Sequence, residues 1–240
     1  MSQVLSEWWN NLFFELQSCE QIESAFSTLS RASQDLGFEY CAFGYTSRTP
    51  FCARNIFIKS SYPEPWVSRY RDKKYLEVDP VAKLDSGELT PAIWSDEFFA
   101  DAKHVWDEAK SAGLAIGISQ PCWDARGQFG VLSLARSDLA LSPREVKALR
   151  PYLAALGHLS ISCISTICKR QKHATIDISL TRREIEILRW TADGKSAKGI
   201  SNALEISVDT VNFHLKNCMR KLNASSKTSA TAYAIAYGLL

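Results

Sequence analysis

A polar stretch at residues 169–177, KRQKHATID, separates two regions of apolar periodicity and divides the chain unequally. The first 169 residues hold 17 lysines and arginines against 20 aspartates and glutamates, whereas residues 170–240 hold 11 against 6. The net charge of +2 therefore hides an acidic large part and a basic small part. Such asymmetry indicates a nucleic-acid-binding region. We predict a large domain at 1–169, a linker at 170–177 and a small domain at 178–240.

The large region mixes helical and strand-like periodicity. The helical patterns lie at about 4–17, 20–36, 63–73, 96–112 and 143–168. The strand-like patterns lie at about 38–46, 54–59, 114–122 and 129–136. We expect Ser142 to cap the last helix and Glu145 to reach back and complete a capping box. Helices around a central antiparallel sheet predict an α/β/α sandwich, so that the whole chain belongs to the α+β class.

Cysteine usage and hydropathy bear on the compartment. The seven cysteines include no C-x-x-C pair, which favours a reducing cytosol over a disulfide framework or a zinc knuckle. The amino end carries Glu7 and Glu15 and does not resemble a signal peptide. It is expected to form an amphipathic helix with one broad apolar face, which contains Leu5, Trp8, Trp9, Leu12, Phe13 and Leu16. No window approaches the roughly 20 apolar residues that we expect of a membrane span. The sequence predicts a cytoplasmic protein without a membrane partner.

Enzyme and metal chemistry find little support in the sequence. Neither G-x-S-x-G nor H-E-x-x-H occurs, so we expect no catalytic residues and no enzymatic activity. His158, Cys163 and Cys168 follow one another at intervals of five, about 140° apart on a helix, and do not converge on a metal. We therefore expect neither a metal nor a cofactor.

The small region consists of four short helical patterns. Thr181 and Glu184 form a capping box for the first, Gly194 ends it, and Ser196 caps the second. Ser207 caps a third helix that runs to about residue 222, and Ser225 or Ser226 caps a fourth that ends near residue 238. Four short helices joined by tight turns in about 60 residues are typical of a helix-turn-helix module.

The third helix carries the candidate DNA contacts. Its apolar face is expected to point to the core and contains Val208, Val211, Leu215, Cys218, Met219 and Leu222. On the opposite arc, Phe213 either is incidental surface exposure or touches a thymine methyl group, with Asn212 and Lys216 beside it for base edges. Lys195, Thr210 and Arg220 are expected near phosphates, where they position the module.

Residues 180–240 resemble the DNA-binding domain of LuxR-type transcription regulators. Glu184, Leu188 and Gly194 stand at positions that the family keeps. Gly199 departs from the pattern, because the family usually has glutamate there, and glycine inside a helix costs about 1 kcal/mol relative to alanine. The resemblance implies a DNA-binding homodimer on an inverted repeat.

The densest aromatic cluster of the large region surrounds an acid. Trp66 and Tyr70 share a helical face, and Asp79 precedes Pro80. Such aromatics can simply fill a core, but a buried carboxylate is costly without a hydrogen-bond donor. An acid with aromatic neighbours and apolar walls would suit the polar head of an amphiphilic ligand.

The spacing Trp66-x3-Tyr70-x8-Asp79-Pro, with Trp94 and Gly117 downstream, closely resembles the autoinducer-binding domain of quorum-sensing LuxR-type receptors. That family binds N-acyl-homoserine lactones. The resemblance implies that Trp66 donates to the lactone carbonyl and that Asp79 accepts from the amide N–H. It also implies the remaining contacts, namely Tyr62 and Ser133 on the amide carbonyl and Tyr70 and Trp94 packed about the head group.

Two further expectations concern the ligand. Val81 stands where some members have a threonine hydroxyl, so that contact is missing here. The candidate acyl-chain wall consists of Phe43, Ile116, Ile118, Val131 and Leu134, although alternation places only half of such residues on one face. A regulator that senses another small amphiphile, or no ligand, is the alternative, and an enzyme acting on acyl amides or lactones is a remote one.

Overall fold

In a computed structural model, the chain forms two compact units. The first comprises residues 1–47 and 55–168, and the second comprises residues 169–240 together with residues 48–54. The structure describes residues 2–46, 51, 56–84, 90–124, 128–173 and 179–240. The long helix at the end of the first unit continues to His173, into the predicted linker 170–177. The domain boundaries therefore stay a prediction.

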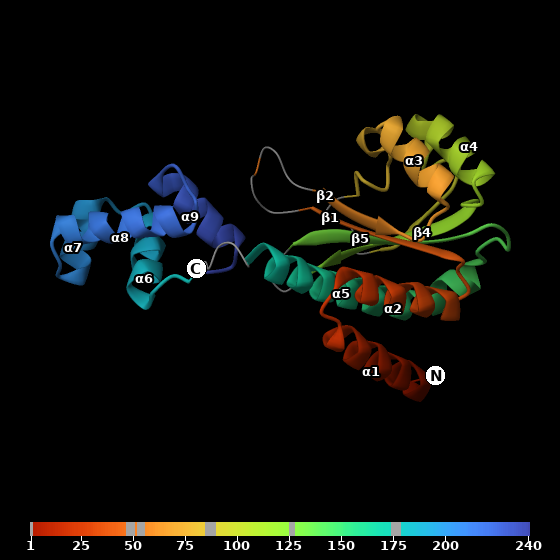
Figure 1. Ribbon diagram of the computed structural model, residues 1–240, viewed down its shortest axis with the longest axis horizontal. Helices are drawn as coiled ribbons and strands as arrows, with labels where there is room; N and C mark the ends of the chain where they lie inside the picture. The colour runs from red at the N-terminus through yellow and green to blue at the C-terminus, as the bar shows by residue number, and fades with distance from the viewer. Residues whose placement is uncertain (1, 47–50, 52–55, 85–89, 125–127, 174–178) are drawn as a thin grey trace. The chain divides into compact units, whose positions relative to one another are not determined.

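A five-stranded antiparallel sheet forms the centre of the first unit, in the order β2-β1-β5-β4-β3 (Figure 1). Its strands are β1 (Tyr40–Thr46), β2 (Ile56–Ser60), β3 (Ala92–Ile93), β4 (Ile116–Trp123) and β5 (Phe129–Arg136). The two-residue strand β3 lies at one edge and was not predicted, because two residues are too few to show a period. The four longer strands confirm the predicted ones to within a few residues.

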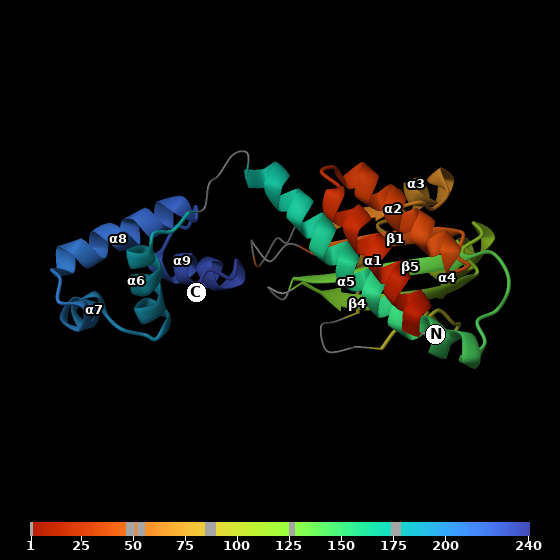
Figure 2. The ribbon, with the colours of Figure 1, turned by 90° about the horizontal axis from the view of Figure 1, so that it is seen from below.

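Helices cover both faces of this sheet (Figures 1 and 2). One face carries α1 (Ser2–Ser18), α2 (Ile22–Asp35) and α5 (Pro143–His173). The other face carries α3 (Glu64–Asp72) and α4 (Lys103–Ser111), together with the 3-10 turns η1 (Tyr75–Glu77) and η2 (Ala100–Ala102). A separate apolar cluster fills each interface. The predicted α/β/α sandwich with a central antiparallel sheet is confirmed.

Helix α5 is long and apolar enough, by length and composition, to cross a membrane, contrary to the expectation that no segment is. Of its most apolar window, 56% is buried inside the unit, where the helix packs against the sheet. Buried leucines and isoleucines line this side, among them Leu153, Leu156 and Ile164. The apolarity of α5 is therefore that of a core helix.

The start of α5 and the apolar face of α1 were both predicted from the sequence. Ser142 caps α5 as predicted, since its Oγ accepts from the Glu145 backbone N–H at 3.2 Å. The Glu145 carboxylate does not reach back, because the buried Arg136 of β5 takes both of its oxygens at 2.9 and 3.1 Å. In α1, Leu12 and Leu16 are buried as expected, and the side chain of Leu5 lies outside the described part.

The second unit contains α6 (Arg182–Ala192), α7 (Ala197–Leu204), α8 (Val208–Lys221) and α9 (Lys227–Ala236). Caps form where the sequence predicts them, at Thr181, Ser196 and Ser207, and Ser226 caps the last helix. Of the face of α8 predicted to be apolar, Val211, Leu215, Cys218 and Leu222 are buried and Met219 packs against them. Val208 is 39% exposed, which contradicts the prediction, because it occupies the first turn of the helix directly after the cap. The predicted four-helix module is confirmed.

Candidate ligand pocket and nucleic-acid interface

A cavity of about 190 Å³ lies between the sheet and the helices α3 and α4 of the first unit. All seven residues predicted to bind a ligand line it. They are Tyr62, Trp66, Tyr70, Asp79, Val81, Trp94 and Ser133. Residues far apart in the sequence meet here because α3, the turn after η1, and the strands β3 and β5 border the same space.

Asp79 provides the acceptor of the cavity. The Tyr70 hydroxyl donates to its Oδ2 at 2.7 Å, and the Val81 backbone N–H donates to its Oδ1 at 2.8 Å. Burial raises the pKa of this carboxyl, although both hydrogen bonds act in the opposite direction. A carboxylate oxygen can accept more than one hydrogen bond, so Asp79 can still accept from an N–H or O–H group in the cavity.

Trp66 offers a donor beside this acceptor. Its side chain is 6% exposed, and its ring meets that of Tyr70 edge to face at 5.8 Å. Among the described residues, no hydrogen-bond partner of the indole N–H is found. The ring lines the cavity, so this N–H is available to donate to an acceptor that a ligand brings there.

Trp94 is held in place by the sheet. Its indole Nε1 donates to Ser119 Oγ at 2.8 Å, and Ser119 Oγ lies 2.8 Å from Ser133 Oγ. The ring covers Gly117, where an added Cβ would come within 2.2 Å of it. Glycine is therefore required at position 117 for this placement of the ring.

Ser119 is a site residue that the sequence analysis missed. It faces Ser133 across the β4–β5 ladder and is fully buried. The signal that could have found it is the register, because strands joined by a short turn place these two serines opposite each other. Tyr62 completes the group, since its phenol interacts with Ser133 and its pKa is raised by burial, then by Cys41 and Asp79.

The apolar wall lies on a different set of strand residues from the predicted one. Val131 lines the cavity, but the other four candidates, Phe43, Ile116, Ile118 and Leu134, do not. Phe43, Ile118 and Leu134 point to the opposite face of the sheet and pack against α2 and α5. Since alternate residues of a strand face opposite sides, their neighbours take the place. The strand residues that line the apolar part are Ala42, Gly44, Thr46, Ile56, Ile58, Phe129, Gly130 and Val131.

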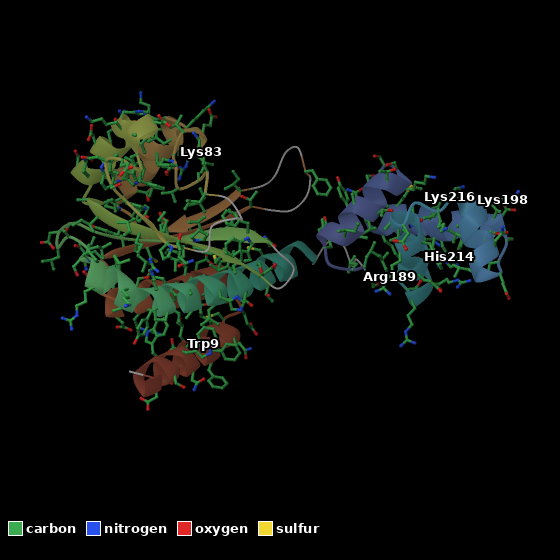
Figure 3. All side chains as sticks on the ribbon, turned by 180° about the vertical axis from the view of Figure 1, so that it is seen from behind. Trp9, Lys83, Arg189, Lys198, His214 and Lys216 are labelled. Carbon is green, nitrogen blue, oxygen red and sulfur yellow. The ribbon has the colours of Figure 1, made fainter. Side chains whose placement is uncertain are left out.

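The second unit presents a cationic surface. Lys195, Asn212, Lys216 and Arg220 are exposed, and Phe213 of α8 is exposed by 61%. Lys216 on α8 and Lys198 on α7 are marked in Figure 3, and Lys198 was not among the predicted residues. An exposed lysine at the start of a helix-turn-helix is a candidate phosphate contact.

Thr210 differs from the other predicted DNA contacts. It is half-buried, and its hydroxyl lies 2.8 Å from that of Ser207, whose Oγ also accepts from the Thr210 backbone N–H at 3.0 Å. The hydroxyl is thus engaged in the cap of α8. A cap residue fixes the start of the helix, and through it the placement of Asn212 and Phe213 one turn later.

Together, an amphiphile-sized pocket and a helix-turn-helix module define a ligand-responsive DNA-binding regulator. Comparison with known proteins agrees. Residues 21–164 match the autoinducer binding domain, and residues 178–234 match the bacterial regulatory proteins of the luxR family. The chain belongs to the LuxR family of quorum-sensing transcription regulators, which are not enzymes.

Two relatives and one solved structure illustrate the similarity. The chain is 34% identical to the transcriptional activator protein PhzR of Pseudomonas fluorescens, over 97% of this chain and 96% of the relative. It is 35% identical to the quorum-sensing regulator RhlR of Pseudomonas aeruginosa, over 97% and 96%. The structure of SdiA in complex with octanoyl-rac-glycerol has a TM-score of 0.84 and 30% identity, and covers 97% of this chain and 95% of its own.

Proposed function

We propose that this protein binds an N-acyl-homoserine lactone in the cavity of the first unit. The observation that carries the proposal is the set of polar groups at one end of the cavity, where the Asp79 acceptor lies near the donors of Trp66 and of the Tyr62–Ser133 pair. An acyl-homoserine lactone offers an amide N–H and two carbonyl groups at its head, which complement this set. Its acyl chain would lie along the apolar strand residues.

A second ligand class has one specific observation in its favour. SdiA, which shares the fold, has a structure with octanoyl-rac-glycerol. An acylglycerol lacks the amide N–H but can donate a hydroxyl to Asp79 instead. The two ligand classes differ in the group that donates to Asp79, an amide N–H or a hydroxyl, so chemical identification of the retained ligand distinguishes them.

We further propose that the protein acts in the cytoplasm as a homodimer that reads an inverted repeat of double-stranded DNA. One helix-turn-helix module contacts one half-site, and a two-fold pair of modules matches a palindromic operator. Asn212, Phe213 and Lys216 would meet base edges, whereas Lys195 and Arg220 would contact phosphates. Ligand binding to the folded state would stabilise it by mass action.

The test is expression with and without a panel of acyl-homoserine lactones, followed by mass spectrometry of the purified protein. We expect one lactone to copurify and to raise the soluble yield. Retention of an acylglycerol or another amphiphile would move the assignment to the second class. Stable protein that retains nothing from the panel would contradict the lactone proposal.

Asp79→Asn tests the acceptor directly. The Val81 N–H fixes the amide oxygen of the new side chain, so that its NH₂ group meets the ligand N–H donor to donor. We expect lactone affinity to fall by about 10- to 100-fold, the worth of a hydrogen bond to a charged group. Asp96→Asn is the matched control, because Asp96 is exposed and lies outside the cavity. Equal affinity of the two variants would contradict the assigned role of Asp79.

A further inference from the structure

A chain of hydrogen bonds leads from Trp94 through the sheet to the cavity. Trp94 Nε1 donates to Ser119 Oγ at 2.8 Å, and the same distance separates Ser119 Oγ from Ser133 Oγ. Trp94 and Ser133 line the cavity, whereas Ser119 is fully buried behind them. The chain therefore starts and ends at residues that line the cavity but passes through a residue that does not line it.

The direction of this chain follows from its first member. An indole N–H can only donate, so Ser119 must accept from Trp94. Among the described residues, the one other polar partner recorded for the Ser119 hydroxyl is Ser133. If Ser133 donated to Ser119, the Ser119 proton would be buried without an acceptor, which is unfavourable. The proton of Ser119 therefore points to Ser133, and Ser133 keeps its own proton for Tyr62 or for the cavity.

We propose that Trp94 and Ser119 are positioning residues that orient the hydroxyl of Ser133, and through it that of Tyr62, so that this side of the cavity presents hydrogen-bond donors. The cavity then selects ligands that carry a strong acceptor, a carbonyl oxygen, at this point. The inference rests on the proposed lactone-binding function and adds to it a cause for selectivity. Its essential feature is the orientation of two hydroxyl groups by a residue that does not contact the ligand.

Under this proposal, each polar group at the polar end of the cavity has one fixed role, either as a hydrogen-bond donor or as an acceptor. Asp79 can only accept when ionised, and the Trp66 N–H can only donate. If the two hydroxyl groups could rotate freely, they could either donate a hydrogen bond to the ligand or accept one from it. When Trp94 fixes their orientation, they only donate. Ligands with a weak acceptor in place of the amide oxygen should therefore be rejected.

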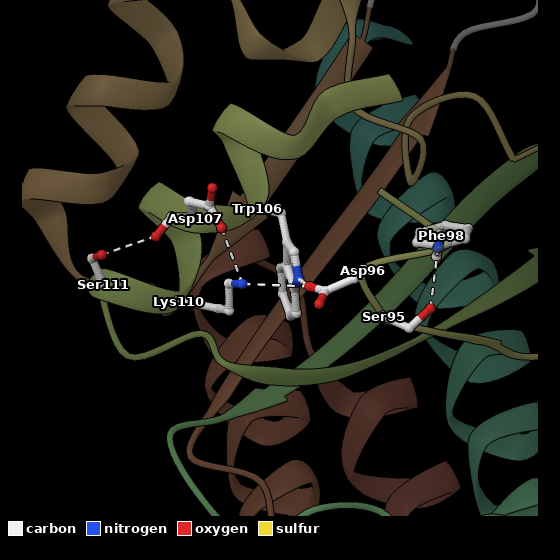
Figure 4. A network of polar contacts seen from close by, with 7 residues as sticks. All are labelled: Ser95, Asp96, Phe98, Trp106, Asp107, Lys110 and Ser111. Atoms are coloured by element: carbon white, nitrogen blue, oxygen red, sulfur yellow. Dashed lines mark hydrogen bonds and ion pairs between the residues drawn. The ribbon is translucent and has the colours of Figure 1, made fainter. Parts of the chain in front are cut away.

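Trp94→Phe removes the first donor and keeps an aromatic ring over Gly117. The matched control is Trp106→Phe, since Trp106 belongs to the same apolar cluster and also donates its indole N–H, to Asp96 Oδ1 at 2.7 Å. Figure 4 shows this bond together with the contact of Lys110 to the same carboxylate. Trp106 does not line the cavity. Both variants lose one indole N–H from one cluster, but only Trp94→Phe frees the serine chain.

The probes are an acyl-homoserine lactone that the full-length protein binds and its thioamide counterpart, in which sulfur replaces the amide oxygen. Sulfur is the weaker acceptor, so the ratio of the two dissociation constants measures the selection for a carbonyl. We expect the wild type and Trp106→Phe to prefer the oxygen form, and Trp94→Phe to lower this ratio by about threefold or more, the worth of an oriented neutral hydrogen bond. General damage to the cavity would weaken both ligands together and leave the ratio unchanged.

Ser119 variants provide a second measurement if Trp94→Phe does not fold. Ser119→Ala should lower the ratio, and Ser119→Thr, which keeps the hydroxyl, should restore it. Ser160→Ala is the control, because Ser160 is equally buried but bonds to the Leu156 carbonyl in α5.

The outcomes separate the two proposals. A wild-type protein that binds no lactone at all overturns the proposed function. A wild type that binds lactone without preferring oxygen to sulfur, or a ratio unaffected by Trp94→Phe or Ser119→Ala, overturns the positioning role alone.

Discussion

Replacing Glu184 by alanine should destabilise the DNA-binding unit far more than the loss of an exposed glutamate from the first turn of a helix would. Glu184 is 3% exposed, although it lies in the first turn of α6. Its Oε2 accepts from the Thr181 backbone N–H at 2.7 Å and from Lys221 Nζ at 2.7 Å. The side chain thus completes the capping box of α6 and joins α6 to the end of α8.

The expected magnitude follows from what the substitution leaves behind. Lys221 is only 21% exposed and would lose its counter-charge, and the Thr181 N–H would lose its acceptor. Removing one partner of a buried ion pair costs about 3–5 kcal/mol, and partial access of Lys221 to water lowers our expectation to about 2–4 kcal/mol. In a unit of this size, that corresponds to a melting temperature lower by about 10–30 °C.

Hydrogen exchange of the full chain measures this loss. We expect the protection of peptides from α6 and α8 to fall, with peptides from β4 and β5 unchanged as an internal reference. Glu186→Ala is the matched control on the same helix, because its i,i+3 pair with Arg183 is only half-buried and is worth about 0.3–0.5 kcal/mol. Equal effects of the two substitutions would refute the assigned role of Glu184.

The pH dependence gives an independent check. Burial alone would raise the pKa of Glu184, but Lys221 and Thr181 outweigh it and hold the pKa below its ordinary value of 4.5. A lowered pKa in the folded state stabilises the fold above that ordinary value, and this stabilisation is lost as the pH falls through the folded pKa. The difference in protection between the wild type and Glu184→Gln should therefore narrow below about pH 4.5. A difference that stays constant down to low pH would contradict this account.

Two further predictions concern the two sites. Gly117→Ala should displace the Trp94 ring, because the added Cβ would lie 2.2 Å from it. We expect a loss of lactone affinity, measured by titration. Gly199→Ala is the control, because a Cβ added there has no contact closer than 3.5 Å. Lys216→Ala should weaken specific DNA binding by about 1–3 kcal/mol and non-specific binding by less, measured by fluorescence anisotropy at several salt concentrations. Equal losses on both DNAs would reassign Lys216 to a phosphate contact.

Features that depend on neighbours along the chain were predictable from the amino-acid sequence. The caps at Thr181, Ser196 and Ser207 were predictable, because each joins a side chain to a backbone N–H three residues later. The helices and the four longer strands followed from their periods. The pocket residues came from the resemblance of Trp66, Tyr70 and Asp79 to a known pattern, and all seven line one cavity.

Which face of the sheet borders the cavity depends on how the helices pack in the folded unit. Strand alternation divides Phe43 from Gly44 and Leu134 from Ser133, but it does not say which set meets α3 and α4. That choice depends on the packing of α2 and α5, which bury Phe43 and Leu134 on the other side. For the same reason, the bond of Glu145 to Arg136 could not be foreseen, nor could that of Trp94 to Ser119. Contacts of this kind join different elements, and their energies depend on distances that the folded core sets.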